Sequence, residues 1–176
     1  IDAPAELKVL LTRYLDLARL AQLRDDEALD DTEWRRLTAA APAQARELLQ
    51  TEGYFEPQIT VQREPGLPVR VKLSVAPGPR VKVSTLNVQV QGPLADQVAA
   101  DDAAARQLNL DLQHRGPLHP GLSFRNATWG ETKLQWLTTL RAAGYAAARL
   151  GQSTARVDVA SGSVTLDGEV QSGPLF

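Results

Sequence analysis

The stretch VRVKLSVAPGPRVKVSTLNVQVQG, which runs from Val69 to Gly92, decides the fold. Valine and leucine alternate with polar residues over its first seven positions, so the apolar side chains share one face of a half-buried strand. Two prolines follow within Ala76–Pro79, and proline cannot donate to a sheet ladder, so strand pairing is predicted to stop there. Alternation then resumes and continues to Val90. The stretch therefore predicts two strands and a boundary between two small domains.

The second of these strands changes phase. Its apolar residues fall into two alternations, the first with Val81 and Val83 and the second with Leu86, Val88 and Val90. A one-residue slip reverses the face that a strand buries, and a bulge is how a strand takes up an extra residue. We therefore predict a bulge or bend at Ser84-Thr85. The two earlier valines should then pack toward the first unit or the interface, and the three later residues in the core of the second.

Length, composition and charge narrow the class of protein. A chain of 176 residues is long enough for one medium domain or two small ones. Its formal net charge is −2 with both signs mixed, which is not the basic balance that nucleic-acid binding requires. It has no cysteine, which excludes disulfides and thiolate metal sites. Because it starts at Ile1 and contains no methionine, it is predicted to be a piece of a longer protein.

The remaining elements are read from hydrophobic periodicity. Helices are predicted at Pro4–Leu23 and Thr32–Glu52, and Pro42 should kink or split the second of them. Strand Gln58–Arg63 should form a hairpin with Val69–Val75. The second half of the chain is predicted to contain a weak helical region over Leu94–Leu112, a helix that ends at Ala143 with Trp129, Leu134, Trp136, Leu137 and Leu140 in its core, and strands at Ala147–Val159 and Ser163–Gln171.

Three short anchors recur in the same order at offsets of about 90 residues. They are the helix starts at Ile1–Pro4 and Val90–Pro93, the helix ends at Gly53-Tyr54 and Gly144-Tyr145, and the strand ends at Val75–Pro79 and Val170–Pro174. The repeat predicts an α+β fold of two tandem β-α-α-β-β units, each a three-stranded mixed sheet covered on one face by two helices. The predicted domains are 1–78 and 79–176, and the first strand of the first unit should lie almost wholly before Ile1.

With these motifs the sequence resembles tandem POTRA domains, the polypeptide-transport-associated modules of Omp85-superfamily outer-membrane proteins. The Gly-Tyr helix ends, the strand-Gly-Pro junctions and the apolar strand Leu86–Gly92 carry the resemblance, which covers nearly the whole chain. Within the superfamily, the start of the first unit is more similar to the translocation-and-assembly-module (TamA) proteins than to BamA. The resemblance implies the periplasmic portion of an outer-membrane protein whose parent chain ends in an outer-membrane β-barrel.

The resemblance also implies a binding function without a cofactor. The partners would be unfolded outer-membrane proteins or autotransporters, or an inner-membrane-anchored partner subunit, and they would bind by adding a β-strand to an exposed sheet edge. The second strand of each unit would be that edge, beside a groove lined by Leu48, Leu49, Leu137 and Leu140. The candidate partner-binding residues are Gln58, Ile59, Thr60, Val61, Gln62, Ala155, Val157 and Val159.

Two other hypotheses stay open at this point. One is the POTRA pair of a two-partner secretion transporter, which would recognise a single exported protein. The other is a small hydrolase or metal-dependent enzyme that uses His114, His119 and Asp111, although no cysteine supports a metal site and no nucleophile-elbow or phosphate-loop motif is present. We therefore expect no catalytic residue, no bound metal and no cofactor.

Overall fold

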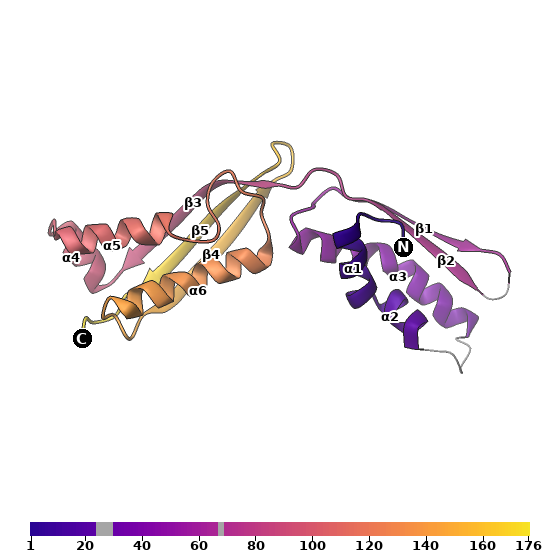
Figure 1. Cartoon of the computed structure of the whole chain (residues 1–176), viewed down its shortest axis with the longest axis horizontal. Helices are drawn as coiled ribbons and strands as arrows, with labels where there is room; N and C mark the ends of the chain where they lie inside the picture. Colours follow the sequence, from indigo (N-terminus) through magenta and orange to yellow (C-terminus); the bar gives the residue numbers. More distant parts are fainter. Residues whose placement is uncertain (24–29, 67–68) are drawn as a thin grey trace. The chain divides into compact units, whose positions relative to one another are not determined.

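The computed structural model describes residues 1–23, 30–66 and 69–176, and the chain divides into two compact units (Figure 1). Unit 1 is Ile1–Arg80 and unit 2 is Val81–Phe176. Unit 1 contains α1 (Ala5–Tyr14), α2 (Asp16–Leu23), α3 (Asp31–Thr51), β1 (Gln58–Glu64) and β2 (Arg70–Ala76). Unit 2 contains β3 (Lys82–Gln91), α4 (Pro93–Ala99), α5 (Ala103–His114), α6 (Asn126–Ala142), β4 (Arg149–Asp158) and β5 (Ser163–Gln171). The predicted α+β fold is confirmed.

The sheet of unit 1 is an antiparallel hairpin with the beginning of a third strand. β1 pairs with β2 from Gln58 opposite Ala76 to Glu64 opposite Arg70. On the other side of β2, the N–H of Asp2 donates to the carbonyl of Leu73 and the carbonyl of Asp2 accepts from the N–H of Val75. Asp2 thus runs parallel to β2 and makes β2 the central strand. All three helices lie on one side of the hairpin (Figure 1).

The first predicted helix of unit 1 is two helices. The chain leaves helical geometry at Leu15, with φ −76° and ψ 125°, and resumes it at Asp16. Residues two apart point to nearly opposite sides of a continuous helix, yet Leu15 and Leu17 are both buried, at 1% and 6% exposure. The break between α1 and α2 allows both leucines to enter the core. The sequence pattern missed the break because Leu7, Leu11 and Leu15 recur at four-residue steps, as they would in a continuous helix.

The second helix is not split by its proline. α3 continues through Pro42 for 21 residues, and buries Leu37, Ala41, Ala45 and Leu49 along one face. At its end, Gly53 has φ 90°, its N–H donates to Gln50, and the N–H of Tyr54 donates to Leu49. This is a Schellman cap, in which a left-handed glycine satisfies the last carbonyls of a helix.

The same cap ends α6 in unit 2. Gly144 has φ 98° and its N–H donates to Arg141, while the N–H of Tyr145 donates to Leu140 at 3.0 Å, the distance of the Tyr54–Leu49 bond in unit 1. The Gly-Tyr pair that marks the sequence repeat therefore encodes one local structure twice.

Unit 2 has the three-stranded mixed sheet that the repeat predicts. The strand order is β3-β5-β4, with β3 parallel and β4 antiparallel to the central β5. α6 contacts both β4 and β5, and α5 contacts β3. Burial alternates strictly along β5: the residues between the buried ones are half-buried, and the buried ones are Val164, Leu166, Gly168 and Val170.

The predicted bulge in β3 is confirmed, but its predicted consequence is wrong. The register shifts between Val83 and Thr85, so Ser84 is the extra residue. On either side of the bulge, Val83 pairs with Val164 and Leu86 pairs with Leu166, both of which belong to the buried face of β5. Directly paired residues share a face of a sheet, so the bulge restores the buried face instead of reversing it.

Val81 and Val83 consequently pack inside unit 2. They are 3% and 2% exposed, and backbone hydrogen bonds join them to the loop after α5. The N–H of Val83 donates to Leu122, and Val81 and Val83 accept from Phe124 and Gly121, respectively. The loop thus pairs with the start of β3 inside unit 2, whereas these two valines were predicted to pack toward the first unit or the interface.

The first helical region of unit 2 is interrupted where the sequence indicates. α4 ends before Asp101, whose φ of 67° is left-handed, and the carboxylate of Asp102 caps α5 by accepting from the N–H of Ala105 at 2.8 Å. Each unit therefore has two short helices in place of its predicted first helix. No helix in residues 1–23, 30–66 and 69–176 has the length and apolar character that a membrane crossing requires.

The core of unit 2 contains four of the predicted apolar side chains of α6, but not Leu134. Trp129, Trp136 and Leu140 are buried and Leu137 is half-buried, while Leu134 is 61% exposed. The ring of Trp136 lies against Gly168 of β5, and the two indole rings meet edge to face with centroids 5.4 Å apart. A tryptophan pair over a glycine of the central strand is thus the centre of this unit.

Gly130 in α6 offers a small gain of stability. A Cβ built at this position meets no atom within 4 Å, and alanine favours a helix interior over glycine by about 1 kcal/mol. Gly130→Ala is therefore expected to raise the free energy of unfolding of unit 2 by up to about 1 kcal/mol in urea titrations. Gly162→Ala adds the same methyl group in equally open space but at φ 63°, and it should lower the stability instead.

Tyr145 is expected to make the stability of unit 2 sensitive to alkaline pH. Its hydroxyl donates to Oε1 of Gln97 at 2.5 Å, and burial together with the nearby Asp102 carboxylate raises its pKa above the ordinary value. As pH rises, the Tyr145 phenol ionises in the unfolded chain at a lower pH than in the folded one. Its contribution to the free energy of unfolding is therefore complete below pH 10 and is lost as pH rises through the folded pKa. We expect the unfolding free energy of the wild type to fall more steeply above pH 10 than that of Tyr145→Phe, with the exposed Tyr14→Phe as the control.

Candidate partner-binding edges

β4 presents an unpaired backbone edge in unit 2. The N–H of Ser172 donates to Gln91, so even-numbered residues of β5 direct their backbone groups toward β3 and odd-numbered ones toward β4. Thr165 and Asp167 lie opposite Arg156 and Thr154 in the register, and these β4 residues therefore bond inward. Ala155 and Val157 consequently direct their N–H and C=O groups outward.

The same argument places a free edge on β1 in unit 1. Leu73 and Val75 of β2 bond to Asp2, so the even-numbered residues of β2 bond to β1. Ile59 and Val61 lie opposite odd-numbered residues and direct their backbone groups outward. In the parts of the chain that the structure describes, these outward groups bond to no other backbone group, and both edges remain open to an added strand.

The predicted binding residues lie on these edges, with one exception. Gln58, Thr60, Gln62 and Ala155 are exposed, and Ile59, Val61 and Val157 are half-buried with their side chains on the helix-covered face. Val159 lies one residue beyond β4, in the turn to β5, and is 40% exposed. The structure thus gathers the other residues into two strands but leaves Val159 at the end of one.

α6 forms the wall beside the β4 edge. Nζ of Lys133 donates to Oγ of Ser153 at 3.2 Å and lies 5.1 Å from the centroid of the Trp129 ring. Leu137 is half-buried one turn later, and Leu134 precedes it on the same side at 61% exposure. Leu134 was expected in the core, because periodicity alone does not separate a core position from the rim of a groove.

α3 forms the corresponding wall in unit 1. Leu49 is fully buried, whereas Leu48 is half-buried and packs at the border of the core. Nη1 of Arg63, at the end of β1, donates to the carboxylate of Asp31 at 2.7 Å, and Arg35 binds the same carboxylate at 2.8 Å. These bonds, with the hydrogen bond from Arg63 as the largest cause, lower the pKa of Asp31 below its ordinary value. They join the start of α3 to the end of the edge strand.

Asp111 and His119, two residues of the metal-site hypothesis, form hydrogen bonds or ion pairs with other groups and not with each other. The carboxylate of Asp111 accepts from Gln107 at 2.9 Å and binds Arg115 at 3.2 Å. His119 forms its hydrogen bond with the carbonyl of Pro120, next to it in the loop. Among the described residues, no group of three or more histidine and carboxylate side chains is placed to hold a metal ion.

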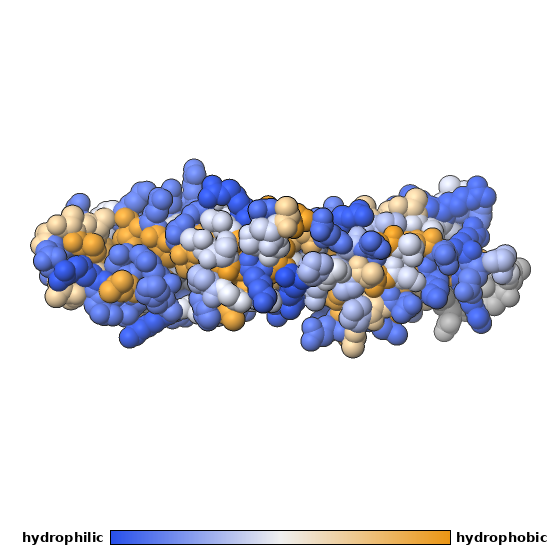
Figure 2. All heavy atoms as spheres, turned by 90° about the horizontal axis from the view of Figure 1, so that it is seen from above, coloured by the Kyte–Doolittle hydropathy of each residue, from blue (hydrophilic) through white to orange (hydrophobic). Residues whose placement is uncertain are grey.

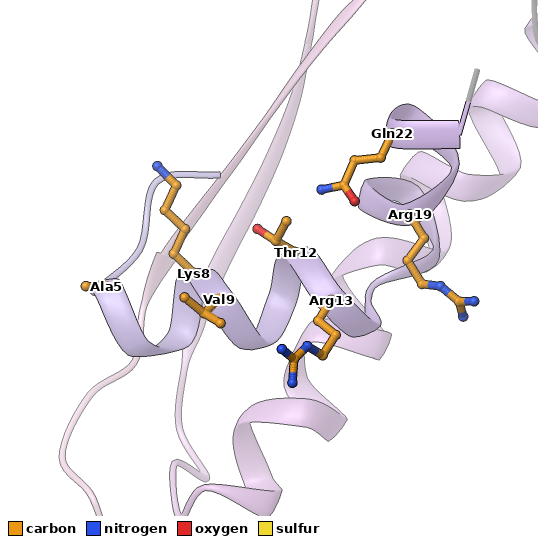
Figure 3. A pocket seen from close by; sticks show the side chains of 7 residues that line it. All are labelled: Ala5, Lys8, Val9, Thr12, Arg13, Arg19 and Gln22. Carbon is orange, nitrogen blue, oxygen red and sulfur yellow. The ribbon is translucent and has the colours of Figure 1, made fainter. Parts of the chain in front are cut away.

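Two hollows lie on the helical side of unit 1. One, of about 300 Å³, runs between β2 and the first two helices and is bordered by Ile1, Val71 and Leu73. Ile1, at its border, precedes Asp2, which pairs in parallel with β2 as β3 does with β5 in unit 2. The other, of about 780 Å³, lies on α1 and α2 (Figure 3). On the face shown in Figure 2, hydrophilic residues cover much of the surface and hydrophobic residues lie between them.

Comparison with solved structures shows similarity to POTRA domains from several bacteria. POTRA1-2 of the periplasmic domain of Omp85 from Anabaena is 14% identical with a TM-score of 0.42, over 99% of this chain and 89% of that one. BamA POTRA3-5 of Haemophilus influenzae is 18% identical with a TM-score of 0.39, over 85% and 54%. The N-terminal domain of Omp85 from Thermosynechococcus elongatus is 21% identical with a TM-score of 0.38, over 96% and 58%. This chain thus spans about half the length of the Haemophilus structure.

The sequence of unit 1 matches a family model. Residues 17–77 match the model described as POTRA domain TamA domain 1, from α2 to the end of β2. No curated protein matches the chain. The family model thus covers the Gly-Tyr cap, β1 and β2, which are features on which the predicted resemblance rests. Residues 17–77 therefore match a POTRA domain, and the predicted resemblance to POTRA modules is confirmed for this part of the chain.

Proposed function

We propose that this chain is a protein-interaction module in the periplasmic part of an outer-membrane protein of the TamA type, with two POTRA domains at 1–78 and 79–176. It would bind unfolded outer-membrane proteins or autotransporters, or an inner-membrane-anchored partner subunit, and would catalyse no reaction. The observation that carries the proposal is the pair of open edges, on β1 and β4, each beside a helix with a partly exposed leucine.

Strand addition suits clients of this kind for a physical reason. An unfolded outer-membrane protein presents segments of about ten residues in which apolar and polar side chains alternate. Backbone hydrogen bonds to an edge are independent of sequence, while every second side chain of the added strand faces the helix. At β4, such side chains would meet Leu134 and Leu137, and at β1 they would meet Leu48.

Photocrosslinking tests this proposal. A photoreactive side chain at Thr60 or at Ala155, both exposed on the edge strands, should crosslink to a ten-residue peptide with alternating apolar residues. The same group at Thr165, on the central β5, is the matched control and should give no crosslink, because this strand is paired on both sides. Crosslinks of equal yield from all three positions, or from none while the chain is folded, would contradict strand addition.

A further inference from the structure

The hollow on α1 and α2 has a chemistry different from that of the strand edges. It exists because the helical axis changes direction at Leu15, which leaves a concave surface between the two short helices. Figure 3 shows side chains from both helices around it. The seven residues that line its volume of about 780 Å³ are Ala5, Lys8, Val9, Thr12, Arg13, Arg19 and Gln22.

The hollow is positively charged. Lys8 and Arg13 come from α1 and Arg19 from α2, all three are exposed, and none of the seven lining residues is acidic. Within the described parts of the chain, none of these three cations forms an ion pair. Arg63 and Arg80 of the same unit, in contrast, each bind a carboxylate, that of Asp31 and that of Glu52, respectively. Three cations without an ion pair among the described residues thus lie in one concavity, in a chain whose formal net charge is −2.

Strand addition is impossible in this hollow. Its walls are α-helices, whose backbone N–H and C=O groups bond along their own helix, so only side chains can recognise a partner here. The floor includes Val9, which is 61% exposed, beside the small side chains of Ala5 and Thr12. A complementary surface therefore has carboxylates for the three cations and a small apolar group for Val9.

We propose that this hollow is a second docking site, which binds an acidic amphipathic helix of a partner protein. Helices pack into concave surfaces through an apolar stripe flanked by charges, and a hollow of this size holds about two helical turns. A bilayer surface is locally flat and fits a convex patch with aromatic side chains, whereas this site is concave and has no aromatic lining residue. The partner is thus bound by charge on the helical side of unit 1, independently of clients bound at the β1 and β4 edges.

The test uses the whole chain and a defined probe. The probe is a fluorescein-labelled 14-residue peptide of alanine, leucine and glutamate, designed as a helix with one apolar stripe and glutamates beside it. We expect the wild type to bind it at 50 mM NaCl and to bind it more weakly at 300 mM, because added salt screens exposed charges. The double variant Arg13→Glu/Arg19→Glu should weaken binding about tenfold or more, since two attractions become repulsions. Circular dichroism should show both proteins folded.

Controls separate the site from net charge and from the strand edges. Arg46→Glu/Arg70→Glu changes the net charge equally, and both residues are exposed in unit 1 outside the hollow. It should bind the peptide within about threefold of the wild type. Val61→Pro, which alters the β1 edge, should also leave this binding intact. An equal loss in both double variants, or no binding by the wild type, overturns the proposal. So does hollow-dependent binding to vesicles of phosphatidylcholine and phosphatidylglycerol without peptide binding.

Discussion

Replacing Trp136 with alanine is expected to lower the free energy of unfolding of unit 2 by about 3–5 kcal/mol, which is the usual cost of removing a buried aromatic side chain. The indole is 1% exposed, lies against Gly168 of the central strand and meets the ring of Trp129 edge to face. A small domain is stable by only about 5–15 kcal/mol, so the loss removes much of the margin. Urea titration of the full chain, followed by circular dichroism, should show an early transition for unit 2 and an unchanged one for unit 1.

Gly168→Ala tests the same contact from the sheet. A Cβ at Gly168 would lie 2.5 Å from Cζ3 of Trp136 and 2.7 Å from Cη2, which are closer than real Cβ contacts. The ring is held from both sides, so we expect an overpacking cost of about 1–3 kcal/mol. Trp136→Phe removes both atoms, and Gly168→Ala should cost less in that background than in the wild type. Equal costs in the two backgrounds would show that the clash is relieved elsewhere.

The bulge in β3 shows what a sequence pattern contains and what it does not. The phase slip between Val83 and Leu86 is visible in the sequence, and it predicted the irregularity at the correct place. Its consequence depends on the partner strand. Val164 and Leu166 are two residues apart on β5 while their partners on β3 are three apart, so the bulge absorbs the difference and all four face the core. One strand read alone does not reveal this register.

Leu15 and Leu134 illustrate the same limit in helices. Leu15 follows Leu7 and Leu11 at four-residue steps, and a continuous helix would turn Leu17 almost to the opposite side, yet both are buried because the backbone breaks at Leu15. Leu134 lies within an apolar pattern, yet it is 61% exposed. Periodicity predicts the face of a helix, but burial at its border depends on where the neighbouring sheet ends. The two edge strands themselves were predicted from the repeat and the family resemblance, because strand order belongs to the fold.

The orientation of backbone groups along β4 gives a sharp test of strand addition. Val157 directs its N–H outward and Arg156 directs its N–H toward Thr165 of β5. Proline removes a donor at either position, and it is tolerated in an edge strand only where the N–H faces solvent. Val157→Pro should therefore keep the fold, whereas Arg156→Pro should leave a carbonyl of β5 without its donor and lower the stability by about 1–3 kcal/mol.

Val157→Pro, the variant that should keep the fold, is the one expected to lose binding of a partner strand. Val157→Pro blocks the edge that an added strand would use, and we expect it to weaken binding of an alternating ten-residue peptide about tenfold, or ~1.4 kcal/mol. Val157→Ala is the matched control for the lost side chain and should bind nearly as well as the wild type. Val61→Pro and Thr60→Pro form the same pair on β1. The N–H of Val61 is directed outward, away from β2, whereas the backbone of Thr60 bonds to Ser74 of β2.

The two proline variants at outward-facing positions, Val157→Pro and Val61→Pro, together decide which edge is used. A loss with Val157→Pro alone assigns binding to unit 2, a loss with Val61→Pro alone assigns it to unit 1, and partial losses with both mean that both edges bind. Unchanged binding in both variants would rule out strand addition at these edges, because each proline removes a donor and places its ring where the new strand would lie. The helical walls with Leu48, Leu134 and Leu137 would then bind clients through side chains alone, so substituting these leucines should have a larger effect than either proline.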